Sequence, residues 1–84
     1  MPTVTRFDGL RVVTYTDDYR PAHVHVLGAG IEAIFILGCP DGPPTLRGSH
    51  GFATAELNRI EEALAASLAA LCAEWERIHG DNRR

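Results

Sequence analysis

Lysine is absent from this sequence: all eight basic residues are arginine. Schiff-base catalysis and the phosphate-loop motif both need the primary amine of a lysine side chain, so both chemistries are excluded. The 11 acidic residues give a formal net charge of −3. This balance argues against broad binding to a nucleic-acid backbone, which needs a basic stripe. A local group of arginines can still hold a small anion or a short RNA segment.

Cysteine is also scarce. The two cysteines, Cys39 and Cys72, lack the paired spacing of a zinc knuckle, and we expect both to be reduced thiols of a cytoplasmic protein. The longest apolar run, residues 63–73, is too short to span a bilayer, so we expect no membrane partner. Residues 1–6 lack a basic stretch followed by an apolar one, so we expect no signal peptide.

The length of 84 residues predicts a single domain over residues 1–84. A chain of this length buries only roughly 60–65% of the surface that its unfolded form exposes, so it builds one modest core. We therefore expect a partner, or a second copy of the chain, to cover part of its surface.

The first half of the chain predicts an antiparallel sheet of about four strands. Runs rich in β-branched and aromatic residues, which are typical of strands, occupy residues 3–7, 10–16, 23–27 and 31–37. The following segment, residues 38–53, is rich in glycine and proline at its start, so we expect a loop of unusual length there.

A hairpin is indicated between the first two runs, because Asp8-Gly9 separates them. This hairpin places Arg6 opposite Arg11, and like charges that face each other across a strand pair cost energy. An acid such as Asp17 or Asp18, or a bound anion, would compensate the pair. The other interpretation is that the two side chains are solvated and splay apart.

The second half of the chain predicts one long helix over residues 54–79, so the fold class is α+β. Apolar residues recur there at spacings of three and four, namely Leu57, Ile60, Leu64, Leu68, Leu71, Trp75 and Ile78. At 1.5 Å per residue such a helix is roughly 39 Å long, whereas strands of five to seven residues reach only about 17–24 Å. A straight helix overhangs its sheet. Either it breaks, or the end that carries Trp75 and Ile78 packs on another chain.

His23 and His25 are two residues apart, so they share one face of the third expected strand. A following turn with an odd number of residues buries both imidazoles against the helix. An even number places them on the outer face of the sheet, beside Glu32. We favour the even turn, because it collects the apolar residues of both strands on one face. These residues are Val24, Val26, Ile31, Ala33, Phe35 and Leu37.

Three interpretations of this outer face stay open. His23 and His25 can form a site, either as acid and base catalysts or as metal ligands with Glu32. The neighbouring apolar residues Leu27, Ile34 and Ile36 can form an interface with a partner. The histidines can also be ordinary surface residues of a strand.

Several blocks of the sequence resemble the bacterial domain-of-unknown-function family 4160. The most specific block is the stretch from Asp18 to Val26, which reads Asp-Tyr-Arg-Pro-Ala-His-Val-His-Val. The other blocks are Pro2-Thr3-Val4, Gly9-Leu10-Arg11-Val12, Gly51-Phe52 before Glu56-Leu57, and a helix that bears Trp75. Two positions depart from the family pattern: Tyr19 stands where a histidine is usual, and Ala53 where a serine is usual.

The resemblance implies a short bacterial cytoplasmic protein without an assigned activity, similar in setting to toxin–antitoxin and mobile-element genes. The family pattern carries over to Arg11, Asp18, Pro21, His23 and His25. We therefore expect a partner-binding component of a two-gene, toxin–antitoxin-like system that uses no cofactor. Its partner is a small protein or a second copy of the chain, bound through the outer sheet face and the helix end, and RNA is a further candidate.

An enzymatic version of this hypothesis is a metal-independent, RNA-cleaving toxin. His23 or His25 would take the 2′-hydroxyl proton, and the other histidine would protonate the leaving oxygen. Arg11 would stabilise the phosphorane, with Asp18 as the fourth candidate residue. The alternative function is a metal-binding module that uses His23, His25 and Glu32 as ligands.

Overall fold

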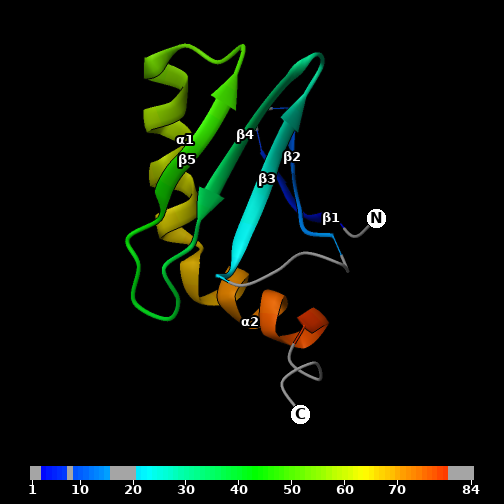
Figure 1. Cartoon of the computed structure of the whole chain (residues 1–84), viewed down its shortest axis with the longest axis vertical. Helices are drawn as coiled ribbons and strands as arrows, with labels where there is room; N and C mark the ends of the chain where they lie inside the picture. Colours follow the sequence, from blue (N-terminus) through cyan, green and yellow to red (C-terminus); the bar gives the residue numbers. More distant parts are fainter. Residues whose placement is uncertain (1–2, 8, 16–20, 80–84) are drawn as a thin grey trace.

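The computed structural model of the chain describes residues 3–7, 9–15 and 21–79. Its elements are β1 (Thr3–Phe7), β2 (Leu10–Val13), β3 (His23–Gly28), β4 (Ile31–Ile36), β5 (Thr45–His50), α1 (Thr54–Ala66) and α2 (Leu68–His79). The strands form one antiparallel sheet in the order β1-β2-β3-β4-β5, and the two helices follow it (Figure 1). The expected α+β class with an antiparallel sheet is therefore confirmed.

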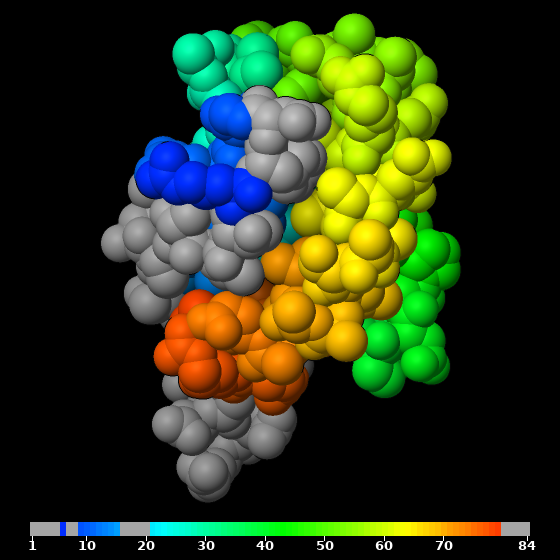
Figure 2. Space-filling model, turned by 180° about the vertical axis from the view of Figure 1, so that it is seen from behind, coloured from blue at the N-terminus to red at the C-terminus, as the bar shows by residue number. Residues whose placement is uncertain are grey.

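The core lies between one face of the sheet and the helices. Its sheet residues are Val12, Val24, Val26, Ala33, Phe35 and Leu37, and its helix residues include Ile60, Leu64, Leu68, Leu71 and Trp75. From behind, α1 and α2 form a continuous band over this side of the molecule (Figure 2). The alternation along β3 and β4 places every second side chain in this core. The opposite face of the sheet is called the outer face below.

A fifth strand corrects the expectation that residues 38–53 form a loop. Residues Thr45–His50 make β5, which pairs with β4 along its length. All six of its residues are exposed. The strand is held by main-chain pairing at the edge of the sheet and not by buried side chains, so it lacks the apolar alternation by which a strand is recognised in a sequence.

The C-terminal half contains two helices, which corrects the prediction of one long helix. The helix is interrupted at Ser67, where φ is −110° and ψ is 16°. At 1.5 Å per residue the 13 residues of α1 span about 20 Å, which matches the length of the strands. Beyond the break α2 turns across the end of the sheet (Figure 1). The break thus replaces an overhang that would leave apolar side chains in water.

A disulfide joins Cys39 to Cys72 across 33 positions of the sequence, with 5.8 Å between the two Cα atoms. It corrects the expectation of two reduced thiols. The helix break explains why spacing did not reveal it, because the turn at Ser67 carries Cys72 towards the segment that follows β4. Disulfides are rare in reducing compartments, so free thiols no longer argue for a cytoplasmic location. Neither α1 nor α2 has the length and apolar character needed to cross a membrane.

Candidate functional site

The turn between β3 and β4 decides which face carries the histidines. Gly28 pairs with Ile31, so the turn contains two residues, Ala29 and Gly30. Gly30 has a φ of +73°, a conformation that favours glycine. The even turn that we favoured is confirmed, and it places His25 opposite Ile34 on the outer face.

A cluster of aromatic rings forms on this face, and we call Tyr15, His23, His25 and Glu32 the histidine cluster. The His23 and His25 ring centroids lie 5.3 Å apart, at an interplanar angle of 64°. The Tyr15 and His25 centroids lie 4.7 Å apart. His25 Nδ1 lies 3.4 Å from Glu32 Oε2, a long contact that contributes little at a solvent-exposed carboxylate. Side-chain contacts in the cluster thus connect the segment after β2 with β3 and β4.

His23 is held by the segment before its own strand. Its Nδ1 lies 2.9 Å from the carbonyl oxygen of Pro21, which can only accept a hydrogen bond, so Nδ1–H donates. In the neutral ring this leaves Nε2 as the acceptor. Pro21 therefore helps to position the imidazole. His23 is only 9% exposed, and the His25 side chain is 13% exposed.

Of the other two expected catalytic residues, Arg11 and Asp18, the structure describes only Arg11. Arg11 lies on β2 opposite Leu27, and Val13 lies opposite His25. Arg11 and His25 are thus diagonal neighbours on one face, roughly 7–8 Å apart. Asp18 lies outside the described residues, as does Tyr19.

The three ligands of the metal hypothesis do not form a metal site in the structure. Within residues 3–7, 9–15 and 21–79, no group of three or more histidine, cysteine, aspartate or glutamate side chains is arranged to hold an ion. His23 directs Nδ1 to a carbonyl oxygen, and only His25 contacts Glu32. His25 thus contacts each of the other two proposed ligands, but the three side chains are not arranged to hold one ion.

A row of side chains crosses the whole outer face at the level of Arg11. The β-hairpin does place Arg6 opposite Arg11, as the sequence predicts. The pairing continues from strand to strand through Arg11 and Leu27, Leu27 and Glu32, and Glu32 and His50. We call these five residues, Arg6, Arg11, Leu27, Glu32 and His50, the outer row. The sequence does not predict that His50 joins this row, because the segment that carries it is expected to be a loop.

Two shallow depressions adjoin one another at the β5 end of the outer row. One, of about 250 Å³, is lined by Glu32, Ile34, Gly48, Ser49 and His50. The other, of about 280 Å³, is lined by Leu27, Gly28, Gly30, Ile31, Glu32 and His50. Both share the Glu32–His50 pair. A hollow with apolar walls and a few polar groups is suited to receive a side chain of another molecule.

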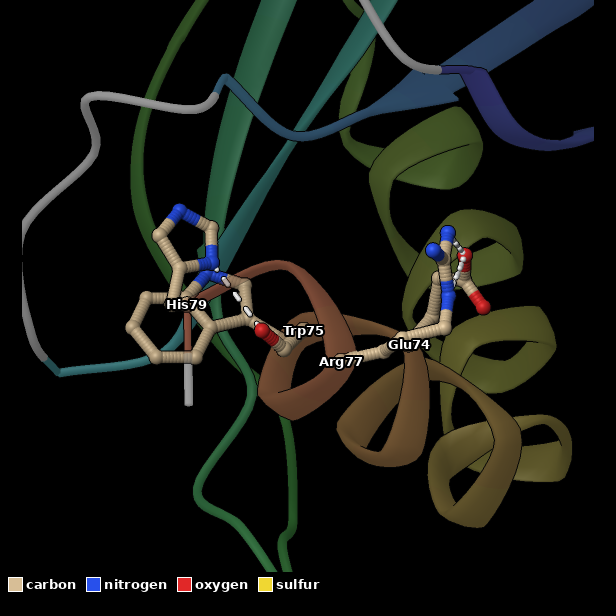
Figure 3. Close-up of polar contacts among 4 residues, drawn as sticks. All are labelled: Glu74, Trp75, Arg77 and His79. Carbon is tan, nitrogen blue, oxygen red and sulfur yellow. Dashed lines mark hydrogen bonds and ion pairs between the residues drawn. The ribbon is translucent and has the colours of Figure 1, made fainter. Parts of the chain in front are cut away.

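Trp75, near the end of α2, lies in the core and not on the surface. Trp75 is only 2% exposed and belongs to the core, so the predicted overhang with Trp75 in contact with another chain is wrong for this residue. Its indole stacks on the His79 ring, with 3.9 Å between the centroids (Figure 3). Figure 3 also shows the surface pair of Glu74 and Arg77, whose hydrogen bond lowers the pKa of Glu74.

His79 is a structural residue whose role the sequence does not reveal. Its Nδ1 lies 3.0 Å from the carbonyl oxygen of Trp75, and its Nε2 lies 2.9 Å from that of Tyr15. The ring therefore bridges the last turn of α2 and the chain that leaves β2. No local pattern reveals this contact, because 64 positions separate His79 from Tyr15.

The sequence matches the model of one protein family, described as "Domain of unknown function (DUF4160)", over residues 9–76. The matched segment contains β2 to β5, α1 and most of α2. No curated protein and no solved structure matches the chain.

Proposed function

The chain belongs to this family of unknown function, and from the geometry of its outer face we propose that it is a binding module for a small protein. The module would be one component of a two-protein system of the toxin–antitoxin kind. The observation that carries the proposal is the outer row with its adjoining depressions. It lies on the face of the sheet that α1 and α2 do not cover.

The composition of this face fits a protein partner. The outer row combines two arginines and a carboxylate with a half-buried leucine, and Ile34 and Ile36 lie half-buried beside it. Protein interfaces combine a partly apolar centre with arginines and a polar rim. A nucleic-acid surface needs a continuous basic stripe, and Glu32 interrupts one here.

Gly48 provides a way to test the proposal without disturbing the fold. It lies opposite Ile34 and lines a depression, and a Cβ atom built on it meets no atom within 4 Å. Gly48→Gln therefore fills the depression while the protein remains folded. The matched control is Ala69→Gln, which places the same side chain at an exposed position of α2.

The experiment is co-purification of the chain with the product of the adjacent gene, followed by measurement of their affinity. We expect a stable complex that Gly48→Gln weakens by about tenfold or more and that Ala69→Gln leaves unchanged. A monomer that never associates with that product, or equal affinities for the two variants, would contradict the proposal.

The contact between His23 and His25 supports a second candidate function, metal-independent cleavage of RNA. Two imidazoles with centroids 5.3 Å apart can supply an acid and a base to one reacting group. We expect His25→Ala to lose cleavage of single-stranded RNA and Ala69→Gln to retain it, with circular dichroism as the control for folding. The absence of cleavage by the parent protein would end this hypothesis.

A further inference from the structure

Two arginines face each other at the other end of the outer row. Arg6 on β1 is directly opposite Arg11 on β2, which sets their Cα atoms about 4.5–5.5 Å apart. Arg6 is exposed and Arg11 is half-buried. Two guanidinium groups thus share one small area of the outer face, and like charges directly opposite each other destabilise a strand pair.

Nothing in the described part of the chain compensates this pair. The ion pairs among the described residues are His25–Glu32 and Glu74–Arg77, and neither includes Arg6 or Arg11. Glu32 is the carboxylate of the outer row. It contacts His25 and lies two strands away from Arg11, about 10 Å across the sheet. Within residues 3–7, 9–15 and 21–79, therefore, no acidic side chain takes up the donors of the two guanidinium groups.

We propose that Arg6 and Arg11 form a binding site for a carboxylate of the protein partner, with Leu27 as the apolar contact beside it. This inference rests on the proposed function, since it names the chemistry that one end of the docking surface recognises. A guanidinium donates two parallel hydrogen bonds to a carboxylate, and the bound carboxylate also removes the repulsion between the two arginines. Leu27 pairs with Arg11, so an apolar side chain next to the acidic residue would contact it.

The arrangement favours a protein carboxylate over an RNA phosphate. RNA carries one negative charge per nucleotide, and its binding depends on several cations along the path of the backbone. Here the two arginines are followed by Leu27 and then by Glu32, and the whole chain has a formal charge of −3. A second phosphate placed towards β4 would meet a negative charge, whereas a single acidic residue meets only the two arginines.

Three probes test the site on the full chain by nuclear magnetic resonance. They are a capped tetraglutamate peptide, a capped tetralysine peptide and hexauridylate RNA, each titrated into the ¹⁵N-labelled protein. We expect tetraglutamate to shift the Nε–H signals of Arg6 and Arg11 in a saturable manner, and tetralysine to leave them unchanged. An absence of saturable shifts would overturn the proposal. A stronger effect of hexauridylate on the same signals would overturn the choice of a protein carboxylate.

The variants Arg6→Gln and Arg11→Gln establish which residues carry the binding. Each should weaken tetraglutamate binding by about tenfold, because a charged hydrogen-bond pair is lost. Arg59→Gln on the exposed surface of α1 is the matched control and should bind like the parent. Equal weakening by all three variants would show that only net charge matters, and the site would be rejected.

Arg6→Glu separates a binding role from a structural one. It converts a like-charge pair into an opposite-charge pair, so the melting temperature should rise while tetraglutamate binding disappears. A lower melting temperature with unchanged binding would show that the arginines serve the fold and would refute the site.

The complex with the partner protein distinguishes the two proposals. If Gly48→Gln weakens that complex and Arg11→Gln does not, the carboxylate site is wrong and the binding module stands. If no complex forms, the proposed function fails.

Discussion

The two faces of the sheet are built from the same strands but are held in different ways. On the helix face Val26, Ala33 and Phe35 are fully buried, and each packs in the core with α1 or α2 behind it. The helices α1 and α2 do not pack on the outer face. The outer row on this face combines two arginines, a leucine, a glutamate and a histidine. Stability explains the choice of residues on the first face. It does not explain two opposed arginines on the second, and this difference directs the functional proposals to the outer face.

Among the variants that remove side-chain atoms, the largest expected effect on stability comes from Trp75, which belongs to the helix face. Trp75→Ala removes a buried indole from a small core and should cost about 3–5 kcal/mol in the free energy of unfolding. Because a small domain has only about 5–15 kcal/mol in total, this loss is a large fraction of its stability. Urea unfolding followed by circular dichroism measures the effect. Ile78→Ala, at a half-buried position of the same helix, should cost clearly less, and equal losses would contradict the assignment of Trp75 to the core.

The disulfide should have the next largest effect. It closes a loop of 33 positions, and the chain-entropy relation gives about 3–4 kcal/mol for a loop of this size. We expect the double variant Cys39→Ser/Cys72→Ser to have a lower melting temperature than the parent. A reducing agent should lower the melting temperature of the parent to that of the double variant and leave the variant unchanged. If it has no effect on the parent, the two cysteines are not bonded.

His79 should contribute a smaller amount, because its ring lies between two carbonyl oxygens and a neutral imidazole donates only one hydrogen bond. His79→Leu keeps an apolar side chain against Trp75 but leaves the carbonyl oxygens of Trp75 and Tyr15 without this partner. A buried polar group that loses its partner costs about 1–3 kcal/mol. Urea unfolding of the variant gives the value. A stability equal to that of the parent would mean that water replaces both contacts.

These differences also explain which parts of the structure could be predicted. The strands up to Ile36 and the histidine face follow from alternation and turn parity, because burial on one side imposes a period of two residues. The position of Arg6 opposite Arg11 follows from a two-residue turn. The fifth strand could not be predicted, since Thr45–His50 pairs through its main chain and exposes its side chains. The length of the expected helix relative to the strands allows a break as one of two outcomes but does not place it at Ser67. The disulfide and the His79 bridge depend on contacts between distant segments, which no local pattern records.

The smallest expected effect on stability is that of a substitution on the outer face. It tests directly whether the two faces of the sheet are packed differently. Gly48→Gln should change the free energy of unfolding by no more than about 0.5 kcal/mol, as exposed substitutions do, since the new side chain meets open space. The matched variant on the helix face is Ala33→Gln. Ala33 lies on β4, the neighbour of the strand that carries Gly48, and its side chain is fully buried. It should unfold the protein or cost several kcal/mol, because the core has no room for the added atoms and no partner for the amide. Urea unfolding of both variants measures the difference. If Gly48→Gln were as destabilising as Ala33→Gln, the outer face would be part of the packed core, and its residues would need no partner to explain them.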